Sequence, residues 1–423
     1  MLRIDNLSQF NGSIEVNDSW NFPESKELLM HKIHAYPAKF PAFLTPKIVS
    51  YLKENNVKVN SIGDIFCGCG TSALESKLLG IDYLGYDINP VATLIAKAKS
   101  NIYSTEKISE LYTEVIRESN KGKFLTPNKV LYHERIRYWF NEDNIIKLYR
   151  LKKSIYNVCP DGKYRILFLT AFSNILKACS KWLTKSIKPQ IDPNKIPLDP
   201  YIAFKKQIRF IITANEEIKS IQTKNSRIKV RTQNILNIKP RENKVDLVIT
   251  SPPYVTSYEY ADLHQLSTLW LGFVDDYKEL RKGTIGSEYA KAEHEIFRIE
   301  NETSERIVKE LFMVDKGKSK SVTKYFYDLD KTVDKTYSLL NENGYVAFVI
   351  GNTSYKGVYI DNAKVLIESF MNKGFKNIEV TKRKISSKIL TPYRDKTGKF
   401  SNNKKGEKVY SHEFIIIAKK PSR

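Results

Sequence analysis

Short apolar runs of strand length alternate with helical stretches in the first and last parts of this chain. The run SIGDIFC (61–67) leads into the helical stretch GCGTSALESKLLG, and YLGYDI (83–88) leads into NPVATLIAKAKS. Strands joined through helices form a mostly parallel sheet with helices on both faces. The sequence therefore predicts an α/β fold of the Rossmann-like, doubly wound kind. A strand and turn are predicted at 226–235, and further strands at 244–250 and 345–350. A closing pair is predicted at 377–385 and 412–420, in which one strand runs antiparallel to its neighbours.

The alternation stops in the middle of the chain. Between 103 and 225, long segments show helical spacing of apolar residues, with Lys and Arg on the remaining faces. This pattern divides the chain into an N-terminal part of the sheet domain (1–102), a basic helical insertion (103–225) and a C-terminal part of the sheet domain (226–423). Residues 281–325 are charged and lack clear periodicity, which predicts a loop or small subdomain.

The positive charge of the chain is concentrated in two segments. Lys and Arg number 69 against 47 Asp and Glu, a formal net charge of +22. Residues 121–230 hold 23 basic and 8 acidic side chains, and residues 371–410 hold 12 and 3. Genome composition is the alternative explanation, because Lys, Asn and Ile are all frequent, but it would spread the charge evenly. A concentrated excess favours a partner with a phosphate backbone.

Composition and cysteine spacing narrow the class of protein. Hydrophobic residues make up 41% of the chain and aromatic residues 12%, as in a folded globular protein. We find neither an apolar run of about 18 residues nor an apolar signal core near the N-terminus, so we expect a cytoplasmic protein without membrane association. Cys67 and Cys69 are too close for an ordinary disulfide, and there is no CxxC pair, so we expect no structural metal.

A glycine-rich turn and a carboxylate follow the first two predicted strands. Gly68 and Gly70 stand at the tip of the first strand, where glycine allows positive φ and a close approach of the backbone to a ligand. Asp87 ends the second strand, at the position that reaches the ribose of a nucleoside in a doubly wound sheet. Three interpretations stay open for the turn: S-adenosylmethionine, a dinucleotide, because Gly68–Gly70–Ala73 also satisfies G-x-G-x-x-[G/A], or a simple tight turn. Asp87 has the alternative role of a helix cap.

Two consecutive prolines stop the strand at 244–250. Pro252 and Pro253 have no N–H to offer a sheet, so a buried strand ends abruptly in Ser251-Pro252-Pro253-Tyr254. Taken alone, this sequence is also typical of a strand-terminating turn.

The chain resembles the DNA amino-methyltransferases, which methylate N4 of cytosine or N6 of adenine. The family's catalytic motif is [DNS]-P-P-[YFW], matched by SPPY at 251–254, and its cofactor motif looks like DIFCGCGT. Its N-terminal cofactor motif is similar to HAYPAKFPAFLTPKIVSYL (34–52), and RTQNILNI (231–238) occupies the place of the segment that contacts the cofactor's adenine. The resemblance covers about 30–100 and 226–423 and leaves the basic insertion unexplained.

The resemblance implies S-adenosyl-L-methionine as cofactor and two groups of site residues. The residues that it implies for cofactor binding are His34, Lys39, Phe40, Asp64, Phe66, Gly68, Gly70, Thr71, Asp87, Ile88, Asn234 and Ile235. The residues that it implies for catalysis are Ser251, Pro252, Pro253 and Tyr254. His34 is expected near the methionine moiety, Asn234 stands where an Asp is common, and Thr71 is expected to cap the helix after the glycine turn.

Amine methylation gives each catalytic residue a task. The target amine is a poor nucleophile because its lone pair is delocalised into the base. The Ser251 hydroxyl and the Pro252 carbonyl are the expected acceptors for its two hydrogens, and the prolines offer no competing donor. Tyr254 would stack on a base swung out of the duplex. Transfer is then a direct displacement that depends on positioning. A C5-cytosine enzyme would need a Cys after Pro, and no Pro-Cys dipeptide exists.

We therefore predict a site-specific DNA N4-cytosine methyltransferase, the modification half of a restriction system with a cognate endonuclease. Serine at 251 favours cytosine N4 over adenine N6, where Asp is commoner in the family, but leaves adenine as the alternative. An enzyme acting on RNA or a protein amide and a non-catalytic nucleic-acid-binding protein are further alternatives. The expected partner is double-stranded DNA with a flipped base, contacted by 121–230 and additionally by 281–325 and 385–410, unless the insertion serves packing or dimerisation. Tyr258 and Tyr260 are candidates for the base pocket.

Overall fold

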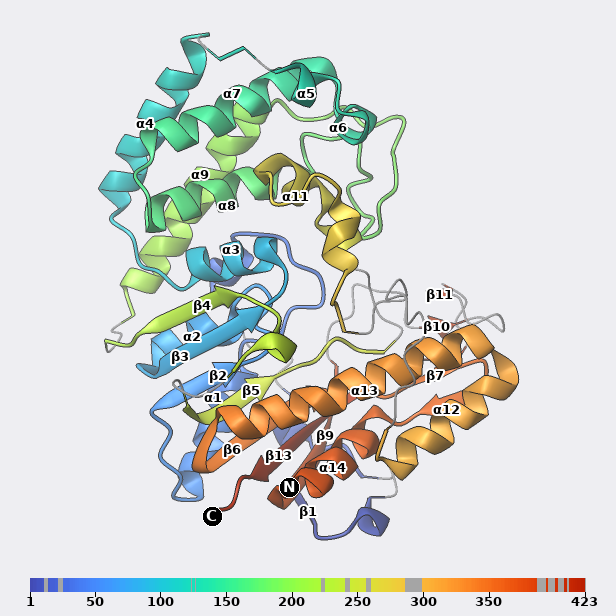
Figure 1. Ribbon diagram of the computed structural model, residues 1–423. Helices are drawn as coiled ribbons and strands as arrows, with labels where there is room; N and C mark the ends of the chain where they lie inside the picture. The colour runs from blue at the N-terminus through green and yellow to red at the C-terminus, as the bar shows by residue number, and fades with distance from the viewer. Residues whose placement is uncertain are drawn as a thin grey trace.

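The structure is a computed structural model of the 423-residue chain (Figure 1). It describes residues 1–10, 14–21, 26–122, 124–125, 127–221, 225–239, 244–255, 260–285, 299–385, 393–394, 400–401, 407–408 and 411–422.

A mixed sheet forms the centre of the molecule. In spatial order its strands are β1 (Leu2–Ile4), β9 (Lys376–Lys384), β13 (His412–Lys419), β6 (Leu340–Ile350), β5 (Val245–Thr250), β2 (Ser61–Asp64), β3 (Asp82–Asp87) and β4 (Ile228–Thr232). The five strands from β6 to β4 are parallel, whereas β13 runs antiparallel to both β6 and β9. This arrangement confirms the predicted doubly wound α/β sheet and its closing pair of strands.

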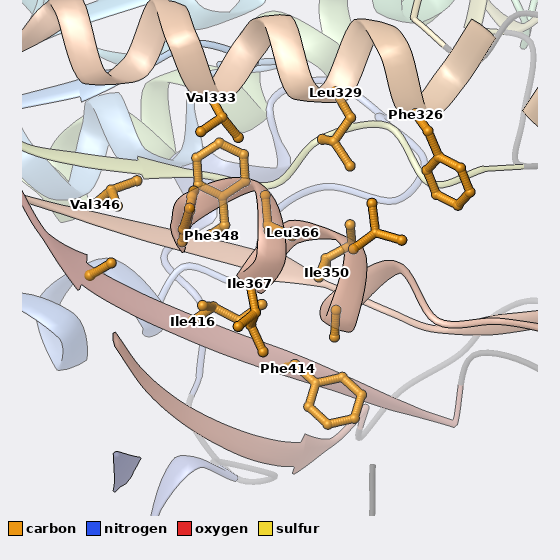
Figure 2. Close-up of a cluster of buried hydrophobic side chains, with 14 of the residues drawn as sticks. Phe326, Leu329, Val333, Val346, Phe348, Ile350, Leu366, Ile367, Phe414 and Ile416 are labelled. Atoms are coloured by element: carbon orange, nitrogen blue, oxygen red, sulfur yellow. The ribbon is translucent and has the colours of Figure 1, made fainter. Parts of the chain in front are cut away.

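Side chains of the central strands alternate between two hydrophobic cores. On β6, Val346, Phe348 and Ile350 face one core, while Ala347 and Val349 face the other. The first core is covered by α13 (Lys316–Leu339) and α14 (Asn362–Lys373). Figure 2 shows side chains of this core from both helices and from strands β6 and β13. The second is covered by α1 (Leu44–Glu54). Burial of β6 on both faces is what a parallel strand between helix layers requires.

A third core lies in the predicted insertion. We call its helices the helical body: α4 (Thr105–Asn120), α5 (Asn128–Leu131), α6 (Glu134–Trp139), α7 (Glu142–Val158), α8 (Lys163–Ile175) and α9 (Pro200–Lys219). This confirms the helical character of that segment. The helical body rests on α3 (Pro90–Lys99), which follows β3 in the chain (Figure 1).

Two distant segments complete the core of the helical body. One is the short helix η3 (Leu29–Lys32), and the other is α11 (Gln265–Leu271), which follows the catalytic motif in the chain. Trp270 of α11 is buried edge-on between Phe140 and Phe172 of the helical body. The division at 103 and 225 stays a prediction, but this core crosses both limits. The segment after the catalytic motif is thereby fastened to the basic helices.

Two expectations for the C-terminal part are wrong. Within 281–325, residues 302–314 form α12 (Glu302–Val314) and residues 316–325 begin α13, so the loop alternative is wrong for this stretch. Helical periodicity was hidden there because the buried face of α12 includes Thr303 and Ser304 beside Ile307 and Leu311. β6 also begins at Leu340, five residues before the predicted start, with an irregular register against β5. Residues 286–298 lie outside the described residues.

The remaining elements are short. They are α2 (Thr71–Leu79), α10 (Tyr260–Leu263), η1 (Leu7–Gln9), η2 (Asp18–Trp20), η4 (Ile235–Asn237), η5 (Tyr277–Arg281), β7 (Thr353–Tyr355), β8 (Val358–Ile360), β10 (Tyr393–Arg394), β11 (Phe400–Ser401) and β12 (Glu407–Lys408). None of the helices in the described ranges combines the length and the hydrophobicity that crossing a lipid bilayer requires.

Asn215 links α9 to the chain between α3 and α4. Its amide oxygen accepts from Tyr103 N at 3.0 Å, and its amide nitrogen donates to Tyr103 O at 2.9 Å. Asn215→Ala would leave both backbone groups buried without these partners, and we expect it to lower the free energy of unfolding by about 1–3 kcal/mol. Thermal and urea unfolding would measure the loss. The exposed Asn194→Ala is the control, expected within about 0.5 kcal/mol of the native protein; equal stability of the two variants would contradict the prediction.

Candidate active site

The topology of the sheet places a crevice between β2 and β5. After β2 the chain builds β3 and β4 on one side, and then returns to build β5 on the other side of β2. The carboxyl ends of β2 and β5 therefore diverge at a switch point, where open α/β sheets bind their ligands. β2 ends at Asp64 and β5 at Thr250, so the glycine-rich turn and the SPPY turn begin on either side of this point.

Asp64 joins the two strand ends. Its Oδ1 accepts a hydrogen bond from the Thr250 hydroxyl at 2.7 Å and another from Phe66 N at 3.1 Å. The side chain is 4% exposed, and this burial raises the pKa of Asp64 to about 7. Asp64 was predicted to bind the cofactor, and the structure turns its carboxyl toward Thr250. Thr250 directly precedes Ser251, so this contact helps to hold the start of the SPPY turn.

The glycine-rich turn depends on the absence of side chains at two positions. Gly68 and Gly70 have φ of 48° and 74°. A Cβ at Gly70 would lie 2.7 Å from the Cα of Ala96 in α3, so only glycine lets α2 begin this close to α3. Gly70 is itself the N-cap residue of α2, and Thr71 is the first helical residue, so the expected capping by Thr71 is wrong.

Asp87 holds this turn against the end of β3. Its Oδ2 accepts from Gly68 N and its Oδ1 from Asn89 N, both at 2.8 Å. Burial raises the pKa of Asp87 to about 6. The helix-cap alternative for Asp87 is wrong, since Asn89 caps α3 through Val91 N. Asp87 is half-buried, and a carboxylate has about four lone-pair sites, so acceptor capacity remains for a ligand.

The residues after β3 and β4 meet beside one loop. The Asn234 amide donates to Gly283 O at 3.2 Å, and a Cβ on Gly283 would lie 3.4 Å from the Ile88 side chain. Ile235 is buried in the core, and Phe66 packs half-buried against that core. Ile88 and Asn234 thus lie together as a cofactor wall would need, whereas the Ile235 side chain supports them from behind.

The N-terminal motif residues have other partners. His34 Nε2 lies 2.8 Å from Ser173 Oγ in α8, and burial lowers the pKa of His34 to about 4. Lys39 Nζ donates to Glu27 Oε2 at 2.5 Å, and Phe40 packs against the core under α1. None of these three contacts joins the glycine turn, so the structure does not bring these residues to the centre of the site.

Sequence reasoning missed two aromatic groups beside the glycine turn. Tyr36 is the nearest side chain to a Cβ built on Gly68, at 3.6 Å from its hydroxyl. The Tyr36 ring lies 5.0 Å from the ring of His264, whose pKa burial lowers to about 3. Tyr36 could have been predicted as a site residue from its position inside the N-terminal motif HAYPAKF. No local pattern could have placed His264 here, because it arrives from the segment between α10 and α11.

The SPPY turn leaves β5 with its tyrosine anchored. Ser251, Pro253 and Tyr254 are half-buried and Pro252 is buried. The Ser251 hydroxyl lies near the Tyr254 phenol and acts to lower its pKa, and the phenol donates to Glu413 Oε2 at 3.1 Å. The Tyr254 ring lies over Gly351, where a Cβ would approach the ring to 3.1 Å. Burial, together with the Glu413 carboxylate, raises the pKa of Tyr254 well above its ordinary value.

A buried ion pair lies behind this turn. Arg383 Nε of β9 donates to Glu413 Oε1 of β13 at 2.7 Å, and the two side chains are 2% and 8% exposed. The Arg383 guanidinium also lies 5.1 Å from the centre of the Phe43 ring. Sequence reasoning missed both residues, because charges within apolar strands reveal no partner until the strands pair. Tyr258 and the side chain of Tyr260 lie outside the described residues.

Comparison with known proteins finds similarity to DNA methyltransferases. Residues 4–98 match the family model described as DNA methylase. The type II methyltransferase M.MvaI from Kocuria varians is 24% identical over 460 residues, spanning 99% of this chain and 95% of that protein. These matches support a DNA amino-methyltransferase family for the chain.

Other relatives match shorter parts of the chain. The type II methyltransferase M.BsoBI from Geobacillus stearothermophilus is 26% identical over 299 residues, 63% of this chain and 57% of that protein. Among solved structures, an rRNA methyltransferase, AviRa from Streptomyces viridochromogenes, aligns with 9% identity and a TM-score of 0.30, covering 96% of this chain and 93% of that one. A TM-score of 0.30 is too low to assign a fold, which rests here on the strand order of the sheet itself.

The site fits the cofactor that this family implies, S-adenosylmethionine. An open, positive-φ backbone at Gly68, the half-buried carboxylate of Asp87 and the apolar side chain of Ile88 lie along the carboxyl ends of β2 and β3. The Gly68 backbone would let the cofactor approach closely. Asp87 would accept hydrogen bonds from its ribose hydroxyls, and Ile88 would lie against its adenine ring. Among the described residues, no cluster of three or more His, Cys, Asp or Glu could hold a metal ion.

The raised pKa of Asp64 makes stability depend on pH. Native Asp64 binds its proton more tightly than the unfolded chain, so its contribution to stability falls as pH rises from about 4 to about 7. Asp64→Asn keeps an acceptor for Thr250 and has no such titration. We therefore expect the stability of the variant relative to the native protein to increase across this window and to be constant above it. Urea unfolding at a series of pH values would measure this, and a pH-independent difference would contradict it.

Proposed function

We propose that this DNA amino-methyltransferase transfers its methyl group to the exocyclic N4 of cytosine. The observation that carries the choice of base is serine at 251, at the end of β5 and beside the cofactor turn. A serine hydroxyl is neutral, and it accepts one amine hydrogen while donating to Tyr254. Adenine N6 is the alternative base.

The residues of the turn orient the amine. S-adenosylmethionine supplies an electrophilic methyl group on a sulfonium centre. Ser251 Oγ and the Pro252 carbonyl accept the two amine hydrogens, which favours the geometry that exposes the nitrogen lone pair. Pro252 and Pro253 keep that carbonyl in place without a competing N–H. The Tyr254 ring, held over Gly351, offers a face for a base extruded from double-stranded DNA.

We assign five residues to the nucleoside of the cofactor: Gly68, Gly70, Asp87, Ile88 and Asn234. Asp87 has two tasks, since it already holds Gly68 N and would also accept from the ribose hydroxyls. Asp64 acts on the turn through Thr250 and not on the cofactor itself.

Expression in a host without DNA methylation tests the base and the role of Ser251 together. Nucleoside mass spectrometry should find N4-methylcytosine, and Ser251→Ala should lower its formation by about 10²-fold or more, since it removes an oriented acceptor. Calorimetry should show unchanged binding of S-adenosylhomocysteine to the variant. N6-methyladenine would replace the proposed base, and near-native activity of Ser251→Ala would refute the acceptor role.

We assign the first DNA contact of the helical body to a patch on and beside α6, composed of Tyr132, Arg135, Arg137 and Tyr138. Tyr132 and Tyr138 are 63% and 49% exposed, and the guanidinium groups of Arg137 and Arg135 lie 5.7 and 4.9 Å from their ring centres. Arginine beside exposed aromatic rings suits contact with phosphates and bases.

The α6 patch is hydrogen-bonded to α11, which follows the SPPY turn in the chain. Arg135 Nε and Trp139 Nε1 both hydrogen-bond to Gln265 Oε1 of α11, at 2.8 and 3.1 Å. Figure 1 shows α6 and α11 on the side of the molecule toward which the arrows of β3 and β4 point. A duplex that delivers a base to Tyr254 would therefore meet α6. The segments 281–325 and 385–410, also predicted to contact DNA, lie partly outside the described residues.

Two single-charge variants test this surface. Arg137→Gln removes one charge from the patch, and we expect weaker DNA binding with a salt slope smaller by about 0.9. Arg117→Gln removes an exposed charge from α4, which pairs with Glu114, and should leave the slope unchanged. Fluorescence anisotropy of a labelled duplex at several salt concentrations measures both. Equal effects of the two variants would show that net charge alone acts and would move the contact away from α6.

We further propose a role in restriction and modification, with a cognate endonuclease as partner in the cell. Similarity along nearly the whole chain to a protein named as a type II methyltransferase supports this proposal. Methylation of a defined DNA site, read by modified-base sequencing, together with protection of that site from a co-encoded nuclease, would test it.

A further inference from the structure

A line of polar side chains runs from the catalytic serine to a buried carboxylate. The Ser251 hydroxyl lies beside the phenol oxygen of Tyr254, where it lowers the pKa of the phenol, and the phenol donates to Glu413 Oε2 at 3.1 Å. The other carboxylate oxygen, Glu413 Oε1, accepts from Arg383 Nε at 2.7 Å. Each oxygen of Glu413 therefore has its own partner, and Oε2 is held toward the active site.

Stacking does not explain this arrangement. A ring that only stacks on a base needs no hydroxyl, and a buried carboxylate is costly unless it is paired. The ion pair with Arg383 would by itself be enough to compensate the negative charge of Glu413. The extra bond to Tyr254 connects that charge to Ser251, the residue that faces the target amine in the proposed function.

Methylation of an exocyclic amine creates a need for a proton acceptor. The nitrogen lone pair forms the new N–C bond, and the C–S bond breaks with its electron pair going to sulfur. The nitrogen then carries a positive charge and one hydrogen too many. That hydrogen must leave to restore the neutral base, and a nitrogen conjugated to the ring is a strong acid in this state.

We propose that Ser251, Tyr254 and Glu413 relay this proton out of the active site. The amine proton passes to Ser251 Oγ, the Ser251 proton to the Tyr254 oxygen, and the Tyr254 proton to Glu413 Oε2. Serine and tyrosine are neutral before and after, and Glu413 ends protonated beside Arg383. Glu413 later returns the proton to water. The relay rests on the proposed function and acts on either amine, cytosine N4 or adenine N6.

The high pKa of the Tyr254 phenol agrees with a relay and disagrees with a free acid. A buried phenol next to a carboxylate does not ionise at neutral pH. In the relay Tyr254 gains a proton from Ser251 as it gives one to Glu413, so no phenolate forms. Arg383 and Phe43 keep Glu413 in place, which makes Arg383 a positioning residue.

Tyr254→Phe is the decisive variant, because it keeps the ring and the Arg383–Glu413 pair and removes only the hydroxyl. We expect kcat to fall by about 10²-fold, with KM for DNA and the dissociation constant for S-adenosylhomocysteine unchanged. Fluorescence of a duplex with 2-aminopurine at the target position should rise on binding as with the native enzyme, since the stacking face is intact. Glu413→Gln should give the same loss, and the double variant no further loss, because the residues act as one unit.

A matched control exists on the same strand as Arg383. Tyr51 of α1 donates its phenol proton to Glu379 Oε2 of β9 at 2.7 Å, a bond of the same kind four residues before Arg383. Tyr51→Phe should leave kcat unchanged.

Each outcome is decisive for the relay. A native kcat in Tyr254→Phe overturns it and leaves the proposed function intact. A changed KM or lost 2-aminopurine signal in that variant also overturns it, because the hydroxyl would then position the base. Absence of DNA amine methylation by the native enzyme overturns both proposals.

Discussion

The hydrogen bond between Asp64 and Thr250 joins the two halves of this enzyme. Parallel strands that diverge at a switch point leave a gap, and neighbouring strand ends have no backbone partners across it. A buried carboxyl at the end of β2 and a hydroxyl at the end of β5 bridge that gap at 2.7 Å. The cofactor turn follows the first residue and the catalytic turn the second. Their relative position is therefore set by the backbone pairing of β2 with β5 and, beyond the last pair at Gly63 and Val248, by this buried side-chain contact.

Each half of the site is supported by elements from its own side of the sheet. Asp87, at the end of β3, holds the glycine turn through Gly68 N. Tyr254 is held through Gly351 of the β6 end and Glu413 of β13, with Arg383 of β9 behind them. The antiparallel insertion of β13 between β6 and β9 brings these charges together. The closing strands thus support the catalytic turn as well as completing the sheet.

The basic helices form more than an appendage to this sheet. Their core takes in Trp270 from the segment after the catalytic turn and Met30 from the segment before the N-terminal motif. The helical body is therefore packed against segments that adjoin both the N-terminal motif and the SPPY turn in the chain. Gln265 of α11 accepts from Arg135 and Trp139, so α6 is attached to the segment that follows the SPPY turn in the chain.

The sequence by itself determined the sheet, the helical insertion and the two turns. Strand patterns, paired prolines and glycines are local signals, because they follow from backbone sterics and from burial of one strand at a time. They were sufficient to place the turn with Gly68 and Gly70 after β2, Asp87 at the end of β3 and the SPPY turn after β5. Helix α12 was missed because Thr303 and Ser304 share its buried face.

Only the tertiary structure decided what the polar side chains bond to. Asp64 accepts a hydrogen bond from Thr250, and His34 hydrogen-bonds to Ser173. Glu413 accepts hydrogen bonds from both Arg383 and Tyr254. These partners lie far apart in the chain and come from strands or helices whose order is set by the packing of the cores. A charged residue inside an apolar strand indicates that burying the charge costs free energy. Strand pairing and helix packing determine which residue pairs with it and offsets that cost.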